Sequence, residues 1–170
     1  ARARFQHCIV GIDEVGTGAL AGPIYVAGVM LEEGQKIVAV RDSKQMTPLA
    51  REVASSRVHE ECVHTVLHSE SVDLINRLGL RACWRLAIVG VVRGFVEKGF
   101  YGPFMLDGLR DDALLHSITS LSKRAIVFDF LVKADTVISS VSAASVVAKV
   151  TRDAHMDVLH GQLSYYAWNK

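Results

Sequence analysis

The sequence contains few cysteines. Cys8, Cys62 and Cys83 are the three present, an odd number that lacks the paired spacing of metal-binding or disulfide motifs. This pattern argues against a disulfide framework and against a structural zinc site, and it is compatible with a reducing compartment. We therefore expect a cytoplasmic protein.

Long apolar runs and a strong net charge are also missing. The longest nearly apolar stretch, Ala21 to Leu31, contains Gly22 and Pro23 and falls well short of the ~20 residues that span a bilayer. No signal peptide is visible at the start, so a membrane partner is not expected. The formal net charge is +1, so any contact with nucleic acid has to come from a local basic patch.

The chain is long and apolar enough for one sizeable core. It has 170 residues, of which 50% are hydrophobic, and it shows no internal repeat, low-complexity segment or linker. We expect a single catalytic domain over residues 1–170. We also expect this domain to be truncated at its C-terminus, because the chain begins without methionine and stops abruptly after Trp168-Asn169-Lys170.

Hydrophobic periodicity predicts a chain of strands followed by an alternation of helices and strands. The expected strands cover residues 7–13, 23–31, 36–40, 62–68, 103–107 and 125–132. The expected helices cover residues 47–59, 71–75, 80–96, 112–122 and 140–160. Three strands joined by short turns and then alternating elements indicate an α/β fold, in which a mixed sheet is covered by helices.

Four carboxylates stand at the ends of apolar or glycine-bearing segments: Asp13, Glu14, Asp107 and Asp135. Any one of them is equally well explained as a turn residue or a helix cap. Together, on segments that read as core, they favour a functional site. Oxygen ligands without clustered cysteine or histidine suit hard cations such as Mg²⁺ or Mn²⁺. A pair of such ions can hold both the attacking and the leaving oxygen of a phosphodiester, so the pattern predicts a metal-dependent nuclease.

Several motifs resemble those of one family. The segment from Gly11 to Pro23, GIDEVGTGALAGP, resembles the opening motif of type 2 ribonucleases H, most closely ribonuclease HII. Asp42-Ser43-Lys44 resembles that family's aspartate-serine-lysine motif, and Leu106-Asp107-Gly108 resembles its third acidic segment. Lys133-Ala134-Asp135, followed by residues 142–153, resembles its fourth acidic segment and helix. The matches run in the family's order.

The resemblance implies a ribonuclease H-like mixed five-stranded sheet flanked by helices. It implies an endonuclease that cuts the RNA strand of RNA–DNA hybrids, or cuts 5′ of ribonucleotides embedded in duplex DNA, and leaves 5′-phosphate and 3′-hydroxyl ends. By the same resemblance, catalysis and the binding of Mg²⁺ or Mn²⁺ fall to Asp13, Glu14, Asp107 and Asp135. Substrate binding falls to Gly16, Thr17, Gly18, Ser43, Lys44, Ser145 and Lys149. The expected partner is the hybrid or the ribonucleotide-bearing duplex, and the expected state is a monomer.

One motif departs from the family pattern. The opening usually carries glycine-arginine-glycine, and here Gly16-Thr17-Gly18 lacks the charge and the fork of the arginine. Threonine at this place resembles ribonuclease HIII, whereas an aspartate at Asp135 favours ribonuclease HII. Two alternatives stay open: a catalytically weak hybrid- or duplex-binding protein on the same fold, and another ribonuclease H-like nuclease. For Arg152 and Asp153 the simplest interpretation is a surface ion pair.

Overall fold

The computed structural model describes residue 5, residues 7–40 and residues 46–168. The strands are β1 (Cys8–Val15), β2 (Ile24–Glu32), β3 (His64–Glu70), β4 (Phe104–Asp107) and β5 (Phe128–Leu131). The α-helices are α1 (Pro48–Glu61), α2 (Val72–Leu78), α3 (Leu80–Val96), α4 (Asp112–Thr119) and α5 (Ser139–Gln162). Two short 3₁₀ helices are η3 (Ala134–Thr136) and η4 (Ser164–Tyr166).

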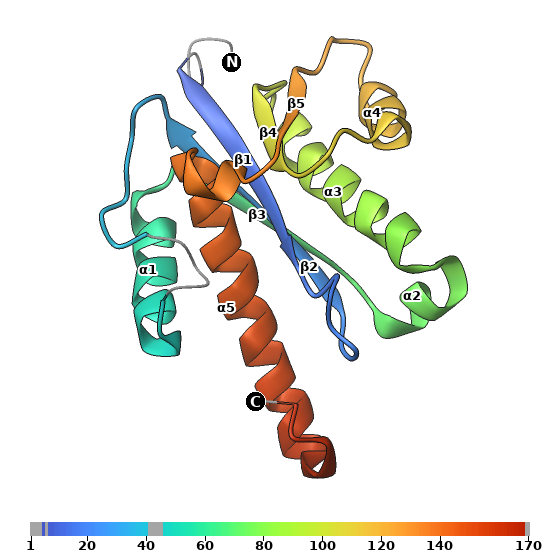
Figure 1. The fold of residues 1–170 in the computed structure, drawn as a ribbon. Coiled ribbons are helices and arrows are strands. Elements are labelled where there is room, and N and C mark those ends of the chain that lie inside the picture. The colour runs from blue at the N-terminus through green and yellow to red at the C-terminus, as the bar shows by residue number, and fades with distance from the viewer. Residues whose placement is uncertain (1–4, 6, 41–45, 169–170) are drawn as a thin grey trace.

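The strands form one mixed sheet in the order β3-β2-β1-β4-β5 (Figure 1). β2 runs antiparallel to both β1 and β3, whereas β4 runs parallel to β1 and β5 runs parallel to β4. The expected five-stranded mixed sheet flanked by helices is therefore confirmed.

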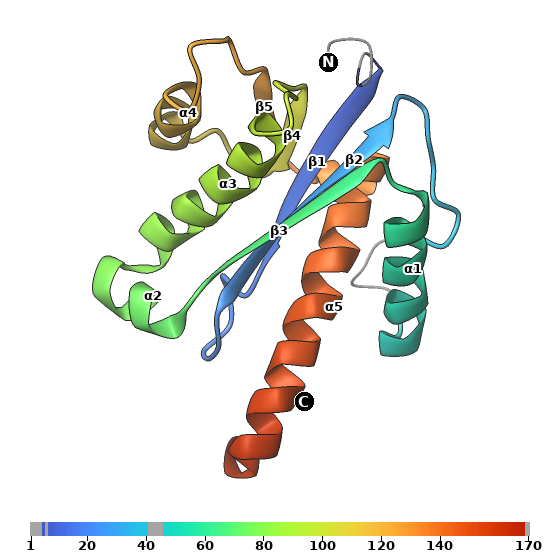
Figure 2. The same ribbon diagram turned by 180° about the vertical axis from the view of Figure 1, so that it is seen from behind.

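Helices cover both faces of the sheet (Figures 1 and 2). Side chains on a strand point alternately to the two faces. In β2, Val26 and Met30 pack with α3 in one apolar cluster, while Ala27, Val29 and Leu31 pack with α5 in another. In the same way Val10 and Ile12 of β1 join the α3 side, which directs the odd-numbered positions of β1 towards α5.

Helix α5 lies very close to β1. A Cβ added at Gly11 would come within 2.1 Å of Val141 N, so no larger residue fits there without a shift of the helix. The helix meets the sheet with small buried residues, among them Ala143, Ala144 and Ala148. This close packing places the first turns of α5 directly against β1.

The expected strand at residues 36–40 is wrong. This segment folds as a turn in which Val40 N donates to Ile37 O at 2.9 Å. Ile37 is buried against the α5 side, whereas Val38 is 92% exposed. Ile37 and the half-buried Val40 pack against the core while Val38 lies in solvent, so the apolar residues of this short segment imitate a strand. The outer edge of β2 is paired instead by β3, which follows α1. The other expected elements are confirmed, with ends shifted by up to three residues.

Cys8, Cys62 and Cys83 are all free thiols, as the sequence predicted. Among the described residues, no helix combines the length and the apolarity that crossing a membrane requires.

Candidate active site

Asp13 and Glu14 lie on the part of β1 that extends beyond its parallel neighbour. β4 pairs with β1 only from Val10 to Ile12, while the antiparallel ladder with β2 continues to Val15. The strand does not end between the two acids, although neighbouring residues of a regular strand point to opposite faces. Both line the same pocket nevertheless, at the edge that β4 leaves unpaired.

Asp107 is the last residue of β4 and reaches the same pocket. Because β1 and β4 are parallel, their C-terminal ends lie at one edge of the sheet. Asp107 Oδ1 accepts a hydrogen bond from Ala134 N at 3.0 Å, which ties the end of β4 to η3.

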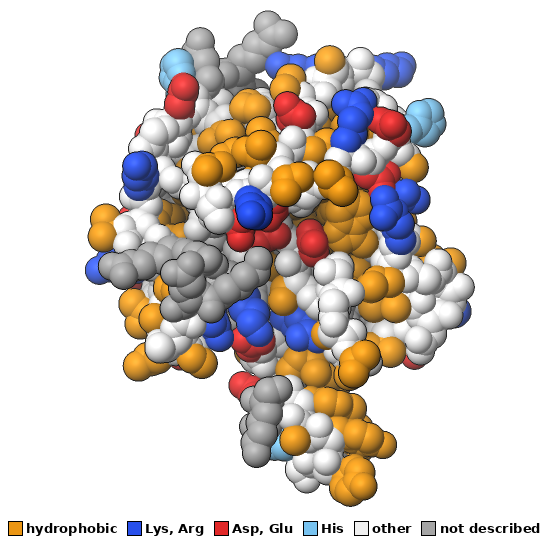
Figure 3. Space-filling view, in the orientation of Figure 1, with side chains coloured by type: hydrophobic (Ala, Val, Ile, Leu, Met, Phe, Trp, Pro, Cys, Tyr) orange, Lys and Arg blue, Asp and Glu red, His pale blue; other side chains and the backbone are white. Residues whose placement is uncertain are grey.

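The pocket that holds these three acids measures about 560 Å³. Figure 3 shows acidic side chains gathered near the centre of this face of the molecule, with Lys and Arg side chains beside them. The other residues that line the pocket are Val15, Gly16, Thr17, Arg51, Ser145 and Lys149. The pocket therefore brings together seven of the expected site residues: Asp13, Glu14, Gly16, Thr17, Asp107, Ser145 and Lys149.

Asp135 lies in η3 and lines a separate pocket of about 610 Å³, together with Lys36, Val40 and Ser142. The hydrogen bond from Ala134 N to Asp107 connects the two pockets through adjacent residues. Among the residues that the structure describes, no three His, Cys, Asp or Glu side chains form a preassembled metal site. The role of Asp135 as fourth ligand stays a prediction.

The electrostatics of the first pocket suit a hard cation. Burial of the Asp13 carboxyl raises its pKa, and the neighbouring Glu14 and Asp107 carboxylates add to the shift, to about 7. Hydrogen bonds donated by the Ser145 hydroxyl and by Glu14 N, the latter at 2.8 Å, oppose the shift without cancelling it. The atoms that could bind a metal ion in this pocket are oxygens, and three of the side chains are carboxylates. The residues present therefore fit Mg²⁺ or Mn²⁺ by their chemistry.

The glycine segment forms a turn beside the acids. Gly16 has φ +101°, and Ala19 N donates to Gly16 O at 3.2 Å. Gly16 and Thr17 line the pocket, whereas Gly18 is exposed and does not. Ser43 and Lys44, with Asp42, lie outside the described residues, so their expected contacts stay predictions.

Arg152 on α5 fastens this turn to the helix, and the interpretation of Arg152 and Asp153 as a surface pair is wrong. Arg152 is buried, donating from Nε to Pro23 O at 3.2 Å and from Nη2 to Ala21 O at 2.8 Å. A Cβ at Gly16 would come within 2.8 Å of Arg152 Nε, so glycine is required for this contact. Asp153 pairs with Lys149 and Arg51 instead.

Sequence reasoning missed both Arg51 and Arg152. Arg152 carried one usable signal, because Ser145, Lys149 and Arg152 follow each other at helical spacing and so share a face of α5. Arg51 carried none, since α1 and α5 lie far apart in the sequence.

Comparison with known proteins gives a consistent result. The protein-family model described as Ribonuclease HII matches residues 10–170. A ribonuclease HII from Shewanella oneidensis is 33% identical over 162 residues, which cover 95% of this chain and 74% of that protein.

Two solved structures have the same fold. The ribonuclease H2 of Pyrococcus horikoshii superposes with a TM-score of 0.77 at 23% identity, over 92% of this chain and 77% of that one. Bst-RNase HIII in complex with Mn²⁺ gives a TM-score of 0.74 at 24% identity, over 92% of this chain and 55% of that one. At these identities the superpositions establish the ribonuclease H-like sheet and helices.

Proposed function

This chain belongs to the ribonuclease HII family and is a metal-dependent endonuclease that cleaves RNA in RNA–DNA hybrids; from that premise we propose that Asp13, Glu14, Asp107 and Asp135 are its metal-binding catalytic residues. The observation that carries this assignment is the convergence of Asp13, Glu14 and Asp107 on one pocket. Asp135 is included because its neighbour Ala134 is bonded to Asp107.

The metal we propose is Mg²⁺ or Mn²⁺. Support comes from the all-oxygen donor set and from Bst-RNase HIII, which was crystallised with Mn²⁺. When bound, such ions supply Lewis-acid chemistry: they lower the pKa of a water and neutralise charge on the leaving oxygen.

The protein side chains orient the reacting groups. The Ser145 hydroxyl and Glu14 N donate to the Asp13 carboxyl and favour its ionised form, which is the form that binds a cation. Asp107 is fixed by Ala134 N. Hydrolysis by an in-line water leaves a 5′-phosphate and a 3′-hydroxyl, and no side chain has to form a covalent intermediate.

Recognition of the RNA strand falls to the turn at Gly16-Thr17 and to Lys149. The backbone amides beside Gly16 can approach a phosphate or a 2′-hydroxyl closely, and the 2′-hydroxyl distinguishes RNA from DNA. Lys149 adds a positive charge at the pocket. We propose that ribonucleotides embedded in duplex DNA are substrates as well as continuous hybrids, and that a cytoplasmic monomer acts on them.

A cleavage assay with single carboxylate variants tests this assignment. Asp107→Asn and Asp135→Asn should each abolish cleavage of a labelled RNA–DNA hybrid in Mg²⁺ and in Mn²⁺, with the fold intact by circular dichroism. Asp129→Asn is the matched control, because Asp129 is exposed and accepts a hydrogen bond from its own neighbour, Phe130 N. Full activity in Asp135→Asn would remove Asp135 from the ligand set.

A comparison of nucleic-acid substrates distinguishes the proposed activity from that of another ribonuclease H-like nuclease. The same enzyme is given a continuous hybrid, a duplex with one ribonucleotide and an all-DNA duplex. Cleavage of the first two with a 3′-hydroxyl product supports the proposal, and equal cleavage of the all-DNA duplex would indicate a nuclease with another specificity.

A further inference from the structure

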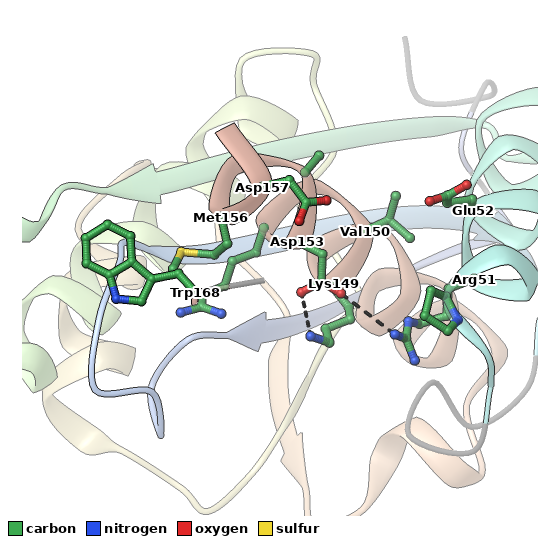
Figure 4. Close-up of a pocket in the computed structure, with 11 residues that line it drawn as sticks. Arg51, Glu52, Lys149, Val150, Asp153, Met156, Asp157 and Trp168 are labelled. Atoms are coloured by element: carbon green, nitrogen blue, oxygen red, sulfur yellow. Dashed lines mark hydrogen bonds and ion pairs between the residues drawn. The ribbon is translucent and has the colours of Figure 1, made fainter. Parts of the chain in front are cut away.

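Two cationic side chains, Arg51 of α1 and Lys149 of α5, stand at a boundary between pockets. Both line the pocket of the three acids, and both also line a neighbouring pocket of about 520 Å³ that extends along α5. Figure 4 shows this second pocket, with Arg51 and Glu52 at one end and Trp168 at the other. A strand that enters the acidic pocket from this side has to pass the two cations.

Asp153 lies between the two cations and pairs with both. Its Oδ1 accepts from Lys149 Nζ at 2.5 Å, and its Oδ2 lies 3.8 Å from Arg51 Nη2, as the dashed lines of Figure 4 indicate. The first contact is a short charge-assisted hydrogen bond. The second is an ion pair too long for a hydrogen bond, so Asp153 holds the guanidinium only loosely.

The guanidinium itself is well oriented. Its Nη1 donates to Met46 O at 2.7 Å, and the side chain is 13% exposed. A planar guanidinium that is oriented in this way suits bidentate binding of a phosphate. The partly exposed Asp153 and Lys149 leave this cluster open to solvent, with side-chain exposures of 37% and 36%.

Substrate binding poses an electrostatic problem at this place. Asp13, Glu14 and Asp107 repel the phosphates of any strand that enters their pocket. Fixed positive charge next to the acids offsets this repulsion, and the family's usual arginine is replaced here by Thr17. Arg51 is the arginine that shares the pocket with Thr17.

We propose that Arg51 and Lys149 form a phosphate clamp for the nucleic-acid backbone, and that Asp153 is its built-in counterion, which a substrate phosphate displaces. The inference rests on the proposed function, and it adds Arg51 as a substrate-binding residue and Asp153 as a competitor of the substrate. A charged phosphate that replaces Asp153 restores the pairing of both cations without moving either helix.

Binding without cleavage tests the clamp. The probe is an 18-base-pair RNA–DNA hybrid, and its affinity is measured by fluorescence anisotropy in EDTA from 25 to 200 mM KCl. Arg51→Met should weaken binding and reduce the slope of log K against log salt by roughly 0.9, the value of one phosphate contact. The matched control is Arg57→Met, since Arg57 lies on the same helix, is exposed and pairs with Glu60. Equal slopes for the two variants would overturn the role of Arg51.

Arg51→Lys covers the case in which the methionine variant is unstable. It keeps the charge, so the salt slope should stay near that of the parent protein while affinity falls, because the fork is lost. If the salt slope of Arg51→Lys were as low as that of Arg51→Met, the result would contradict the clamp. Since the assay contains no active metal, failure here leaves the assignment of the carboxylates untouched, and inactive carboxylate variants leave the clamp untouched.

Asp153→Asn separates a counterion from a structural strut. As a counterion, Asp153 competes with the substrate, so its neutralisation should tighten hybrid binding several-fold at low salt and steepen the salt slope. As a strut, its loss would weaken binding as much as Arg51→Met does, and that result would overturn the counterion role.

Discussion

Asp13 on β1 and Asp111 before α4 are both buried carboxylates, 8% and 5% exposed, yet their surroundings are opposite. Asp111 accepts from Arg81 Nη2 at 2.9 Å, from Arg85 and from Leu114 N. Burial raises the pKa of Asp111, but the hydrogen bonds from Arg85 and Leu114 N and the charge of Arg85 outweigh burial, and its pKa lies below the ordinary value. The pKa of Asp13 is raised to about 7.

The difference separates structure from function. On the α3 side of the sheet, a carboxylate is surrounded by donors and fixes the start of α4 by capping it. On the α5 side, carboxylates are crowded together although this costs stability, an arrangement that a protein keeps for binding or chemistry. Burial alone does not distinguish the two cases, whereas the sign of the neighbouring charges does.

The strongest test of this contrast is Asp13→Asn. Cleavage of a hybrid should fall on the order of 10³-fold or more, because a ligand to the metals is lost. Thermal stability should stay equal or rise by roughly 2–4 °C, because repulsion from Glu14 and Asp107 is relieved. Single-turnover cleavage rates, with the enzyme in excess over the hybrid, measure the first effect. A melting curve followed by circular dichroism measures the second. A lower melting temperature would mean that Asp13 stabilises the fold as Asp111 does.

Arg152→Met tests whether the turn at Gly16 positions the substrate. Two backbone carbonyls lose their donor, so KM for the hybrid should rise about tenfold while kcat changes much less, because Asp13 and Glu14 are held by the β1–β2 ladder and not by the turn.

Arg85→Met is the control for the loss of a paired arginine. Arg85 bonds Asp111 on the opposite side of the sheet, so its removal should lower the melting temperature without changing KM. Partial recovery of KM in Arg152→Lys would support positioning. Equal changes in KM for the two methionine variants would show that only stability is involved.

The sequence predicted best what depends on local pattern. Helix α3 has the expected bounds because Cys83, Ala87, Ile88, Val91 and Phe95 repeat at helical spacing on its buried face. β1 was expected from its short apolar run, and Asp13 and Glu14 were singled out because they stand at the end of that run.

Contacts between segments that are distant in the chain could not be predicted from the sequence. Arg152 bonds residues 129 and 131 positions away, and its helical spacing from Ser145 and Lys149 places it on their face of α5 without revealing these partners. The segment 36–40 failed for a related reason, since the edge of β2 is taken by a strand that follows a helix. Which pocket Asp135 lines depends on the path of η3, which no motif encodes.

Asp111→Asn tests the second carboxylate of the comparison, the one that we expect to stabilise the fold. The amide can still cap α4, but the charge facing Arg81 and Arg85 is lost, and the free energy of unfolding should fall by about 2 kcal/mol, a value reduced by the exposure of Arg81. Asp112→Asn is the matched control, because Asp112 is an exposed neighbour that pairs with Arg110. That variant should change stability by less than about 0.5 kcal/mol. Urea unfolding measures both.

The pH dependence of the Asp111 effect has a definite sign. A carboxyl whose pKa is depressed in the folded state contributes stability above its unfolded pKa, near 3.9, and loses it as the pH falls through the folded value. The difference in unfolding free energy between the parent protein and Asp111→Asn should therefore be constant from pH 7 to about 5 and shrink below about 4. A difference that persists unchanged at pH 3 would exclude the ionised carboxylate as its source.

The smallest expected effect is that of Thr17→Arg, which adds a donor to the side of the molecule that has a surplus of carboxylates. Thr17 lines the acidic pocket, so an arginine there should contact one backbone phosphate, tighten hybrid binding a few-fold in EDTA and steepen the salt slope by roughly 0.9. Ala19→Arg places the same charge in the same turn but outside the pocket, since Ala19 is exposed and does not line it. If both variants steepen the slope equally, net charge alone explains the gain and Thr17 is not on the substrate path. If only Thr17→Arg does so, the turn fastened by Arg152 is where the substrate backbone meets the protein, and the carboxylates of the pocket act on a strand held by cations around them.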